Sequence, residues 1–203
     1  MLRHDEMKLI NGHGNNGIKK DYSYDAKKSP VDVEVVLDCE AGTVSYVVDG
    51  HKLGVAFTGL SGRTLRLIIS SGFSSRIEIL SYEAHGAVAP ALPPPAPPAP
   101  SAALVTGGDE WDLAASSPDA RAKCPSTTVH QGDMSVRPIV GKRLVRSGVH
   151  TWRLRCKDNG GGNHCFFYGV ASDRLSDVSD PAWVSKEAWM LRHDEMKLIN
   201  APW

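Results

Sequence analysis

The stretch that decides the fold is VDVEVVLDCEAGTVSYVVDGHKLGVAF, residues 31–57. β-Branched and aromatic residues alternate in it with polar ones, which is the period of a half-buried β-strand. Alternate side chains share a face, so we expect Val33, Val35 and Leu37 to be buried together, and likewise Val44, Tyr46 and Val48. Glu40–Gly42 and Asp49–Gly50 predict the intervening turns, and Asp-Gly between apolar runs is a strong hairpin signal.

Similar short runs recur on both sides of this stretch. They are LRLIIS (65–70), RIEILSY (76–82), HTWRLRC (150–156), HCFFYGVA (164–171), EAWMLR (187–192) and MKLIN (196–200). We interpret 150–156 and 164–171 as a strand pair joined by the tip KDNGGGN, and the last two runs as a hairpin over His193–Glu195. No segment carries a helical apolar stripe longer than a turn or two. This pattern predicts an all-β sandwich or barrel.

Composition excludes several classes of partner. The chain has 203 residues, of which 41% are hydrophobic, enough for a sizeable core. The 23 Lys and Arg balance the 23 Asp and Glu, which removes the main electrostatic attraction to nucleic acid or an anionic membrane. No apolar run approaches the roughly 18 residues of a membrane helix, and the opening MLRHDEMKLIN lacks the apolar core of a signal peptide. We expect neither nucleic acid nor membrane as a partner.

The four cysteines are far apart in the sequence. Cys39, Cys124, Cys156 and Cys165 form no CxxC pair, which disfavours a zinc site. This spacing favours free buried thiols in a reducing compartment, so we expect a cytoplasmic protein.

A proline-rich segment divides the chain. Residues 86–109 read GAVAPALPPPAPPAPSAALVTGGD, and seven of the thirteen prolines lie between Pro90 and Pro100. Proline cannot donate to a strand ladder and has a fixed φ, so this segment is expected to be an extended linker. Docking to an SH3-type or WW-type partner through its PxxP pattern is the less favoured alternative. The linker leaves two parts, 1–85 and 110–203.

An eleven-residue sequence occurs twice. MLRHDEMKLIN spans residues 1–11 and again 190–200, in different contexts, so it is not an array of packed repeats. Overlaying the copies produces one continuous frame that runs from Asp109 to Asn200 and resumes at Gly12 to end near His85. On this interpretation the chain is circularly permuted: 110–203 is the N-terminal half of one sandwich and 1–85 is its C-terminal half.

In the unpermuted frame several motifs resemble, in order, those of the SPRY family. They are SGVHTWRL (147–154), YGVA (168–171), AW (188–189) with Ile199, GTVSY (42–46), DG (49–50), LGVAF (53–57) and LSGRTL (60–65). The last, with the strand ending at Tyr82, is most similar to the SPRY domains of SOCS-box proteins. The resemblance implies a SPRY-type antiparallel β-sandwich, circularly permuted or swapped between chains.

The chain also departs from this family. Arg66-Leu67-Ile68 stand where the family usually has a proline, and no SOCS box follows Tyr82. The ubiquitin-ligase adaptor role of SOCS-box proteins therefore does not carry over.

The duplication supplies two candidates for one hairpin slot. One copy can close the sandwich in the same chain, a composite hairpin can use Trp189–Arg192 with Met7–Asn11, or the halves can pair between protomers by domain swapping. Effective concentration favours closure within one chain. We therefore expect a monomer, with a domain-swapped oligomer as the alternative.

The residue patterns argue against catalysis. His4-Asp5-Glu6 and their second copies are consecutive at a hairpin tip, so their side chains cannot all converge on a metal. Ser147 and His150 lack a GxSxG elbow, and Gly160–Gly162 lack the following Lys-Ser/Thr of a P-loop. We predict no catalytic residue, no metal and no cofactor, and we find no calcium-ligand set for a lectin.

What remains is recognition, because loops on a rigid sandwich carry binding. The resemblance implies a shallow peptide site built from loops. It places Phe73, with Gly72 and Ser74, and the loop Ser179–Trp183, with Asp180 and Trp183, at contact positions, while Tyr22 and Tyr24 lie in a further aromatic loop that no motif assigns. We expect a non-catalytic protein-interaction module that binds a short peptide or a partner's loop. The alternative is an assembly subunit that oligomerises by exchanging the duplicated hairpin.

Overall fold

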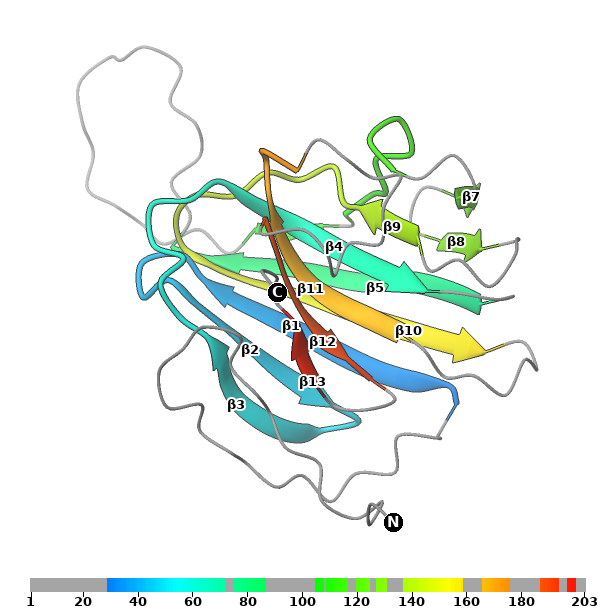
Figure 1. The fold of residues 1–203 in the computed structure, drawn as a ribbon, viewed down its shortest axis with the longest axis horizontal. Coiled ribbons are helices and arrows are strands. Elements are labelled where there is room, and N and C mark those ends of the chain that lie inside the picture. Colours follow the sequence, from blue (N-terminus) through cyan, green and yellow to red (C-terminus); the bar gives the residue numbers. More distant parts are fainter. Residues whose placement is uncertain are drawn as a thin grey trace.

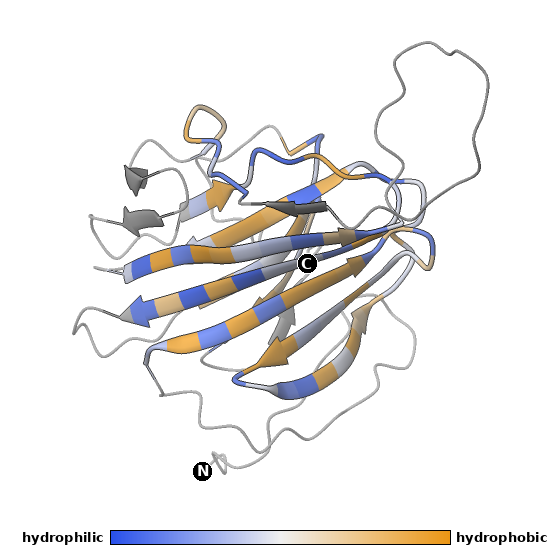
Figure 2. Ribbon diagram, turned by 180° about the vertical axis from the view of Figure 1, so that it is seen from behind, coloured by the Kyte–Doolittle hydropathy of each residue, from blue (hydrophilic) through white to orange (hydrophobic). Residues whose placement is uncertain are grey.

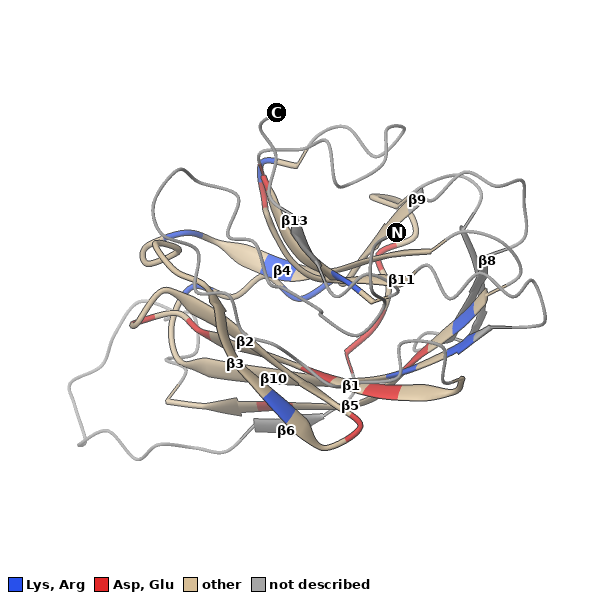
Figure 3. Ribbon diagram, turned by 60° about the horizontal axis from the view of Figure 1, so that its bottom comes forward, with Lys and Arg blue, Asp and Glu red and all other residues tan. Residues whose placement is uncertain are grey.

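The structure is a computed structural model, and its described residues form two stacked antiparallel sheets (Figures 1 and 3). It describes residues 29–71, 75–86, 105–107, 109–116, 120–124, 127–130, 137–158, 166–175, 187–193 and 197–199. The regular elements of these ranges are all strands. None of these ranges holds a helix that is long and apolar enough to cross a membrane.

The larger sheet has the order β3-β2-β1-β10-β5-β8-β7, with β6 also paired to β5. Its strands are β1 (Val31–Asp38), β2 (Thr43–Val48), β3 (His51–Phe57), β5 (Ser75–His85), β6 (Val105–Gly107), β7 (Ala120–Cys124), β8 (Thr127–His130) and β10 (Val149–Asp158). The smaller sheet has the order β13-β12-β11-β4-β9. Its strands are β4 (Leu65–Ser71), β9 (Arg137–Val140), β11 (Phe166–Ser172), β12 (Ala188–Arg192) and β13 (Lys197–Ile199).

The β1–β2–β3 meander follows the predicted pattern. Every predicted inward residue of β1 and β2 is buried, and hydropathy alternates along these strands (Figure 2). The first turn is closed by Asp38, whose Oδ1 accepts the Ala41 N–H at 2.8 Å. In the second turn Asp49 and Gly50 both have positive φ, 47° and 81°, which explains the Asp-Gly pair.

One predicted pairing is wrong. The strands predicted at 150–156 and 164–171 do not pair with each other: β10 lies between β1 and β5 in the larger sheet, whereas β11 lies between β12 and β4 in the smaller one. Both strands have apolar residues that the core must cover, and the sandwich covers them by placing one strand in each sheet. Adjacency in sequence therefore did not indicate pairing here.

The main core lies between the sheets and is built from the inward faces of both. Trp152, Tyr46 and Tyr168 are its large members, and Trp152 and Tyr168 are fully buried. Strands β4 and β11 are buried on both faces, because a second cluster covers the far side of the smaller sheet. That cluster comprises Ile68, Val140, Phe167, Ala171, Leu175, Ala188 and Met190.

Each sheet contains strands from before and from after the proline-rich segment. β10 pairs with β1 on one side and β5 on the other, and β11 pairs with β4. The segment predicted as a linker, 86–109, ends differently from the prediction: Val105–Gly107 pair with β5, and Asp109 is buried. Residues 105–107 belong to the sandwich, because they form backbone hydrogen bonds with the edge of β5.

The C-terminal copy of the repeated sequence occupies the smaller sheet. Met190 pairs with Gly169 of β11 and, on its other side, with Ile199 of β13. The N-terminal copy, residues 1–11, lies outside the described residues.

Candidate protein-interaction site

The predicted contact side chains lie outside the described residues. They are Tyr22, Tyr24, Gly72, Phe73, Ser74, Asp180 and Trp183. The structure does describe the residues that flank the two predicted loops, and these define where each loop leaves the sandwich.

The loop of Gly72–Ser74 leaves from a firmly held base. Ser71 and Ser75, which bracket it, are buried, and the Ser75 hydroxyl donates to the Ser71 hydroxyl at 2.7 Å. Ser71 pairs with Phe166 and Ser75 with Asp158, so four strand ends meet here. The two ends of this predicted loop are therefore held by strand pairing and by the hydrogen bond between Ser71 and Ser75.

The loop that contains Asp180 and Trp183 leaves from the other end of the smaller sheet. Its flanks are Leu175 and Glu187. They lie near the end of the β4–β11 pair where Ser172 is opposite Leu65, whereas the Gly72–Ser74 loop leaves from the end where Phe166 is opposite Ser71. Seven residues of β4 separate the two ends, about 20 Å at the rise of a strand. The flanks of the two predicted loops therefore lie at opposite ends of this sheet.

Arg63, which is not among the predicted contact residues, lies beside the Glu187 flank. Its guanidinium sits 4.9 Å from the centroid of the Trp189 ring and 3.8 Å from Glu187 Oε2. The Arg63 side chain is half exposed, whereas Trp189 is buried, as predicted for a core residue. A cation stacked on an aromatic ring is held in place and still offers donors to a ligand. In the sequence, Arg63 is marked only by its place in LSGRTL (60–65), one of the motifs that resemble the SPRY family.

A buried polar cluster ties the segment after the linker to the larger sheet. Trp152 Nε1 donates to Asp109 Oδ2 at 2.7 Å, and Asp109 Oδ1 accepts the Glu110 N–H. Next to it the Tyr82 hydroxyl lies 2.7 Å from His150 Nδ1, and His150 Nε2 lies 2.7 Å from the Ser147 carbonyl. Because a carbonyl only accepts, Nε2 carries the proton and Tyr82 donates to Nδ1.

The titration behaviour of this cluster follows from burial. Burial lowers the pKa of His150, partly opposed by its hydrogen bond to the Ser147 carbonyl. Burial raises the pKa of Tyr82 to about 12, against the lowering effect of Arg143, whose guanidinium lies 4.3 Å from the Tyr82 ring centroid. Both His150 nitrogens are engaged, so this imidazole is a structural link between strands.

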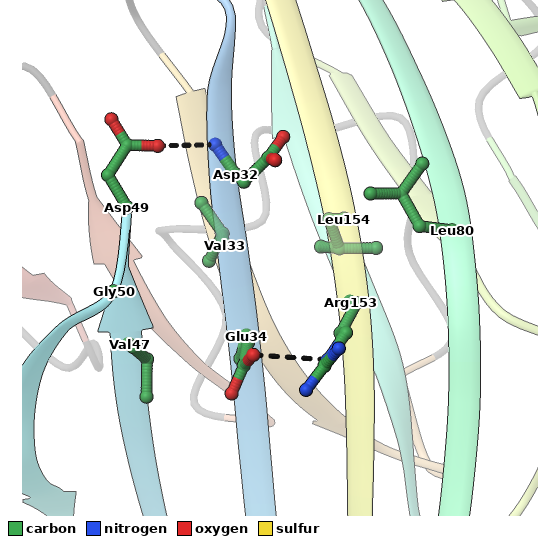
Figure 4. Close-up of a pocket in the computed structure, with 9 residues that line it drawn as sticks. All are labelled: Asp32, Val33, Glu34, Val47, Asp49, Gly50, Leu80, Arg153 and Leu154. Atoms are coloured by element: carbon green, nitrogen blue, oxygen red, sulfur yellow. Dashed lines mark hydrogen bonds and ion pairs between the residues drawn. The ribbon is translucent and has the colours of Figure 1, made fainter.

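The outer face of the larger sheet has a shallow depression of about 450 Å³ (Figure 4). It is lined by Asp32, Val33, Glu34, Val47, Asp49, Gly50, Leu80, Arg153 and Leu154. Its charges are paired: Arg153 Nε lies 3.0 Å from Glu34, Arg155 binds Asp32 through two bonds of 2.7 and 2.8 Å, and Asp49 accepts the Asp32 N–H. Such exposed cross-strand pairs are typical of a solvated sheet face and indicate no ligand chemistry.

Two cysteines, Cys39 and Cys156, have side chains that the structure describes. Cys39 and Cys156 are free and buried, as expected. Burial raises the pKa of Cys39 to about 11, with Glu40 and Asp38 adding to the effect. Among the described residues no group of three or more His, Cys, Asp or Glu is placed to hold a metal ion.

Comparison with known proteins finds a family similarity over part of the chain. The SPRY domain model matches residues 5–83. SPRY domain-containing SOCS box protein 1 of Bos taurus, Homo sapiens and Mus musculus is in each case 49% identical over 37 residues, 18% of this chain. The match spans only 14% of each relative's length. The SPRY domain model thus covers residues 5–83, and the described residues form the two antiparallel sheets of an all-β sandwich.

Proposed function

We propose that this chain is a non-catalytic protein-interaction module that binds a short peptide or a partner's loop through its sandwich loops. The observation that carries the proposal is the SPRY match over residues 5–83, which includes the loop at Gly72–Ser74. The rigid base of that loop, with the Ser71–Ser75 hydrogen bond, supports it. A site held on rigid strand ends loses less conformational entropy when a ligand binds.

The proposed contact residues are Phe73 with Gly72 and Ser74, Asp180 with Trp183, and Tyr22 with Tyr24. An aromatic side chain between small neighbours has the usual composition of a binding hot spot. Because the flanks of the first two sets lie at opposite ends of the smaller sheet, we treat the Phe73 loop as the primary site.

The test is selection of a displayed random peptide library on the full chain, followed by binding of the selected peptides to Phe73→Ala. We expect a loss of about 2 kcal/mol in binding, close to thirty-fold in Kd, with an unchanged melting temperature. Leu80→Ala is the control, since Leu80 is an exposed apolar residue on the outer face of the larger sheet. Equal binding by Phe73→Ala and wild type, or a large fall in its melting temperature, contradicts this assignment.

The circular permutation belongs to the same proposal. Its support is that each sheet contains strands from both parts, with β10 between β1 and β5 and β4 between β11 and β9. We propose that residues 1–85 and 110–203 are complementary halves of one sandwich joined by a proline-rich spacer. Buried free thiols at Cys39 and Cys156 favour a reducing, intracellular setting.

Assembly through hairpin exchange is the second candidate function. It is favoured by the presence of two identical eleven-residue segments and one described slot, filled by β12 and β13. Light scattering after size exclusion separates the two functions. A concentration-independent monomer favours the interaction module, and dimers or open oligomers favour assembly.

A further inference from the structure

The edge of β11 pairs with the hairpin β12–β13, most of which is duplicated sequence. Arg192, Leu191 and Met190 pair with Phe167, Tyr168 and Gly169, and β13 completes the hairpin. Of the residues in β12 and β13, only Ala188 and Trp189 lie outside the eleven repeated positions. The chain therefore contains a second segment with the sequence that this slot accepts.

The repeated side chains make the specific contacts of the slot. Leu191 belongs to the main core and Met190 to the second cluster, and both are fully buried. The buried His193 places Nδ1 3.0 Å from the Tyr168 hydroxyl and donates its backbone N–H to the Phe166 carbonyl at 2.8 Å. Arg192 stacks over Phe167 at 5.7 Å. The corresponding residues of the other copy, Met1, Leu2, Arg3 and His4, are identical.

Trp189 distinguishes the two copies. The Tyr46 hydroxyl donates to its carbonyl at 3.4 Å and Arg63 covers its ring. These contacts lie outside the repeated residues, so they stabilise the C-terminal copy only.

The N-terminal copy is tethered close enough to compete. Residues 12–30 connect it to β1, and an extended chain of that length reaches about 60 Å. A tether of this kind provides effective concentrations near millimolar. The SPRY model matches residues 5–83 as one stretch, so it includes part of this copy together with β1 to β5.

We propose that the edge of β11 is a strand-acceptor site for the peptide sequence MLRHDEMKLIN, and that residues 1–11 of the same chain are its second ligand, exchanging with residues 190–200. The proposal rests on the permuted sandwich described above and not on the Phe73 loop. It therefore stands or falls separately from peptide binding at that loop.

The test measures how far Leu2→Ala lowers the melting temperature of the full chain in three backgrounds: wild type, Leu191→Ala and a control. In wild type the resident copy fills the slot, so Leu2→Ala leaves the melting temperature unchanged. In Leu191→Ala, residues 190–200 bind the edge of β11 more weakly and residues 1–11 take their place. Leu2→Ala then lowers the melting temperature by about 5 °C. Leu67→Ala is the control background, because Leu67 is buried in the same core outside the repeat.

A synthetic MLRHDEMKLIN peptide supplies the second measurement. Excess peptide raises the melting temperature of the Leu2→Ala/Leu191→Ala chain, because binding to the folded state alone stabilises it, and a scrambled peptide does not. Equal cost of Leu2→Ala in all backgrounds, or no shift with the peptide, overturns the proposal. A third outcome is that Leu191→Ala forms a dimer and that adding Leu2→Ala abolishes it. In that case residues 1–11 of a second chain fill the slot, which also overturns the proposal that they act within the same chain.

Discussion

Val35 in β1 lies directly opposite Trp152 in β10, and both side chains are fully buried. The two residues come from different sides of the proline-rich segment, so this pair joins the two parts of the chain in one sheet. Trp152 in turn donates to Asp109, the first described residue after β6. The centre of the larger sheet therefore depends on contacts between residues that are distant in sequence.

The bond between Asp109 and Trp152 is the first test of this centre. Asp109→Ala leaves the buried Trp152 N–H without an acceptor, so we expect a loss of about 1–3 kcal/mol in the free energy of unfolding. In a Trp152→Phe background the same change costs less, because the unsatisfied donor is gone. Urea denaturation of the four chains measures this coupling, with Glu110→Ala, whose side chain is about half exposed, as the control; additive losses contradict the assignment.

Gly169→Ala tests how closely β12 packs on β11. A Cβ at Gly169 would lie 2.8 Å from Met190 Cα and would also meet the Trp189 carbonyl, so backbone must move. We expect a loss of about 3 kcal/mol or more in unfolding free energy, seen as a large fall in melting temperature.

Gly50→Ala is the control for this change. Its φ is +81° but nothing lies within 4 Å of the added Cβ, so only backbone strain of about 1–2 kcal/mol is expected. If the two variants lose the same stability, steric contact at β12 is not the reason that position 169 is glycine.

His150 predicts a pH dependence of stability. Burial lowers its pKa in the folded state, so between the unfolded value near 6.5 and the lower folded value the unfolded chain binds more protons. The free energy of unfolding therefore falls as pH drops below about 6.5 through this window. His150→Gln removes that part of the dependence, which urea denaturation at pH 5 to 8 measures; parallel pH profiles for both chains contradict the prediction.

The buried thiols predict slow labelling of the native chain. Burial raises the pKa of Cys39 to about 11 and raises that of Cys156 further, so few thiolates exist at pH 8 and both are shielded. In a Cys124→Ser/Cys165→Ser background, we expect a thiol reagent to label two groups in urea and none quickly in buffer. Rapid labelling in buffer indicates that these strands open more readily than the packing suggests.

The local elements of this fold were predictable because their signals are local. Alternation between Val31 and Phe57, the Asp-Gly turn at 49–50 and the hairpin that ends at Ile199 depend on residues within one or two strands of one another. The free state of Cys39 and Cys156 and the burial of Trp152 and Trp189 were also expected, and the structure confirms them. The predicted contact residues at the loops remain predictions, since the structure does not describe them.

By itself the sequence determined the strand period, the turns, the all-β class and the presence of two copies of MLRHDEMKLIN. Only the tertiary structure decided that β10 and β11 lie in different sheets, that Asp109 is buried against Trp152, and that residues 190–200 rather than 1–11 occupy the described hairpin. The physical reason is that strand periodicity defines which face of a strand is apolar but not which strand covers it. That choice depends on contacts such as those of Trp189 with Tyr46 and Arg63, which form only when distant parts of the chain pack together.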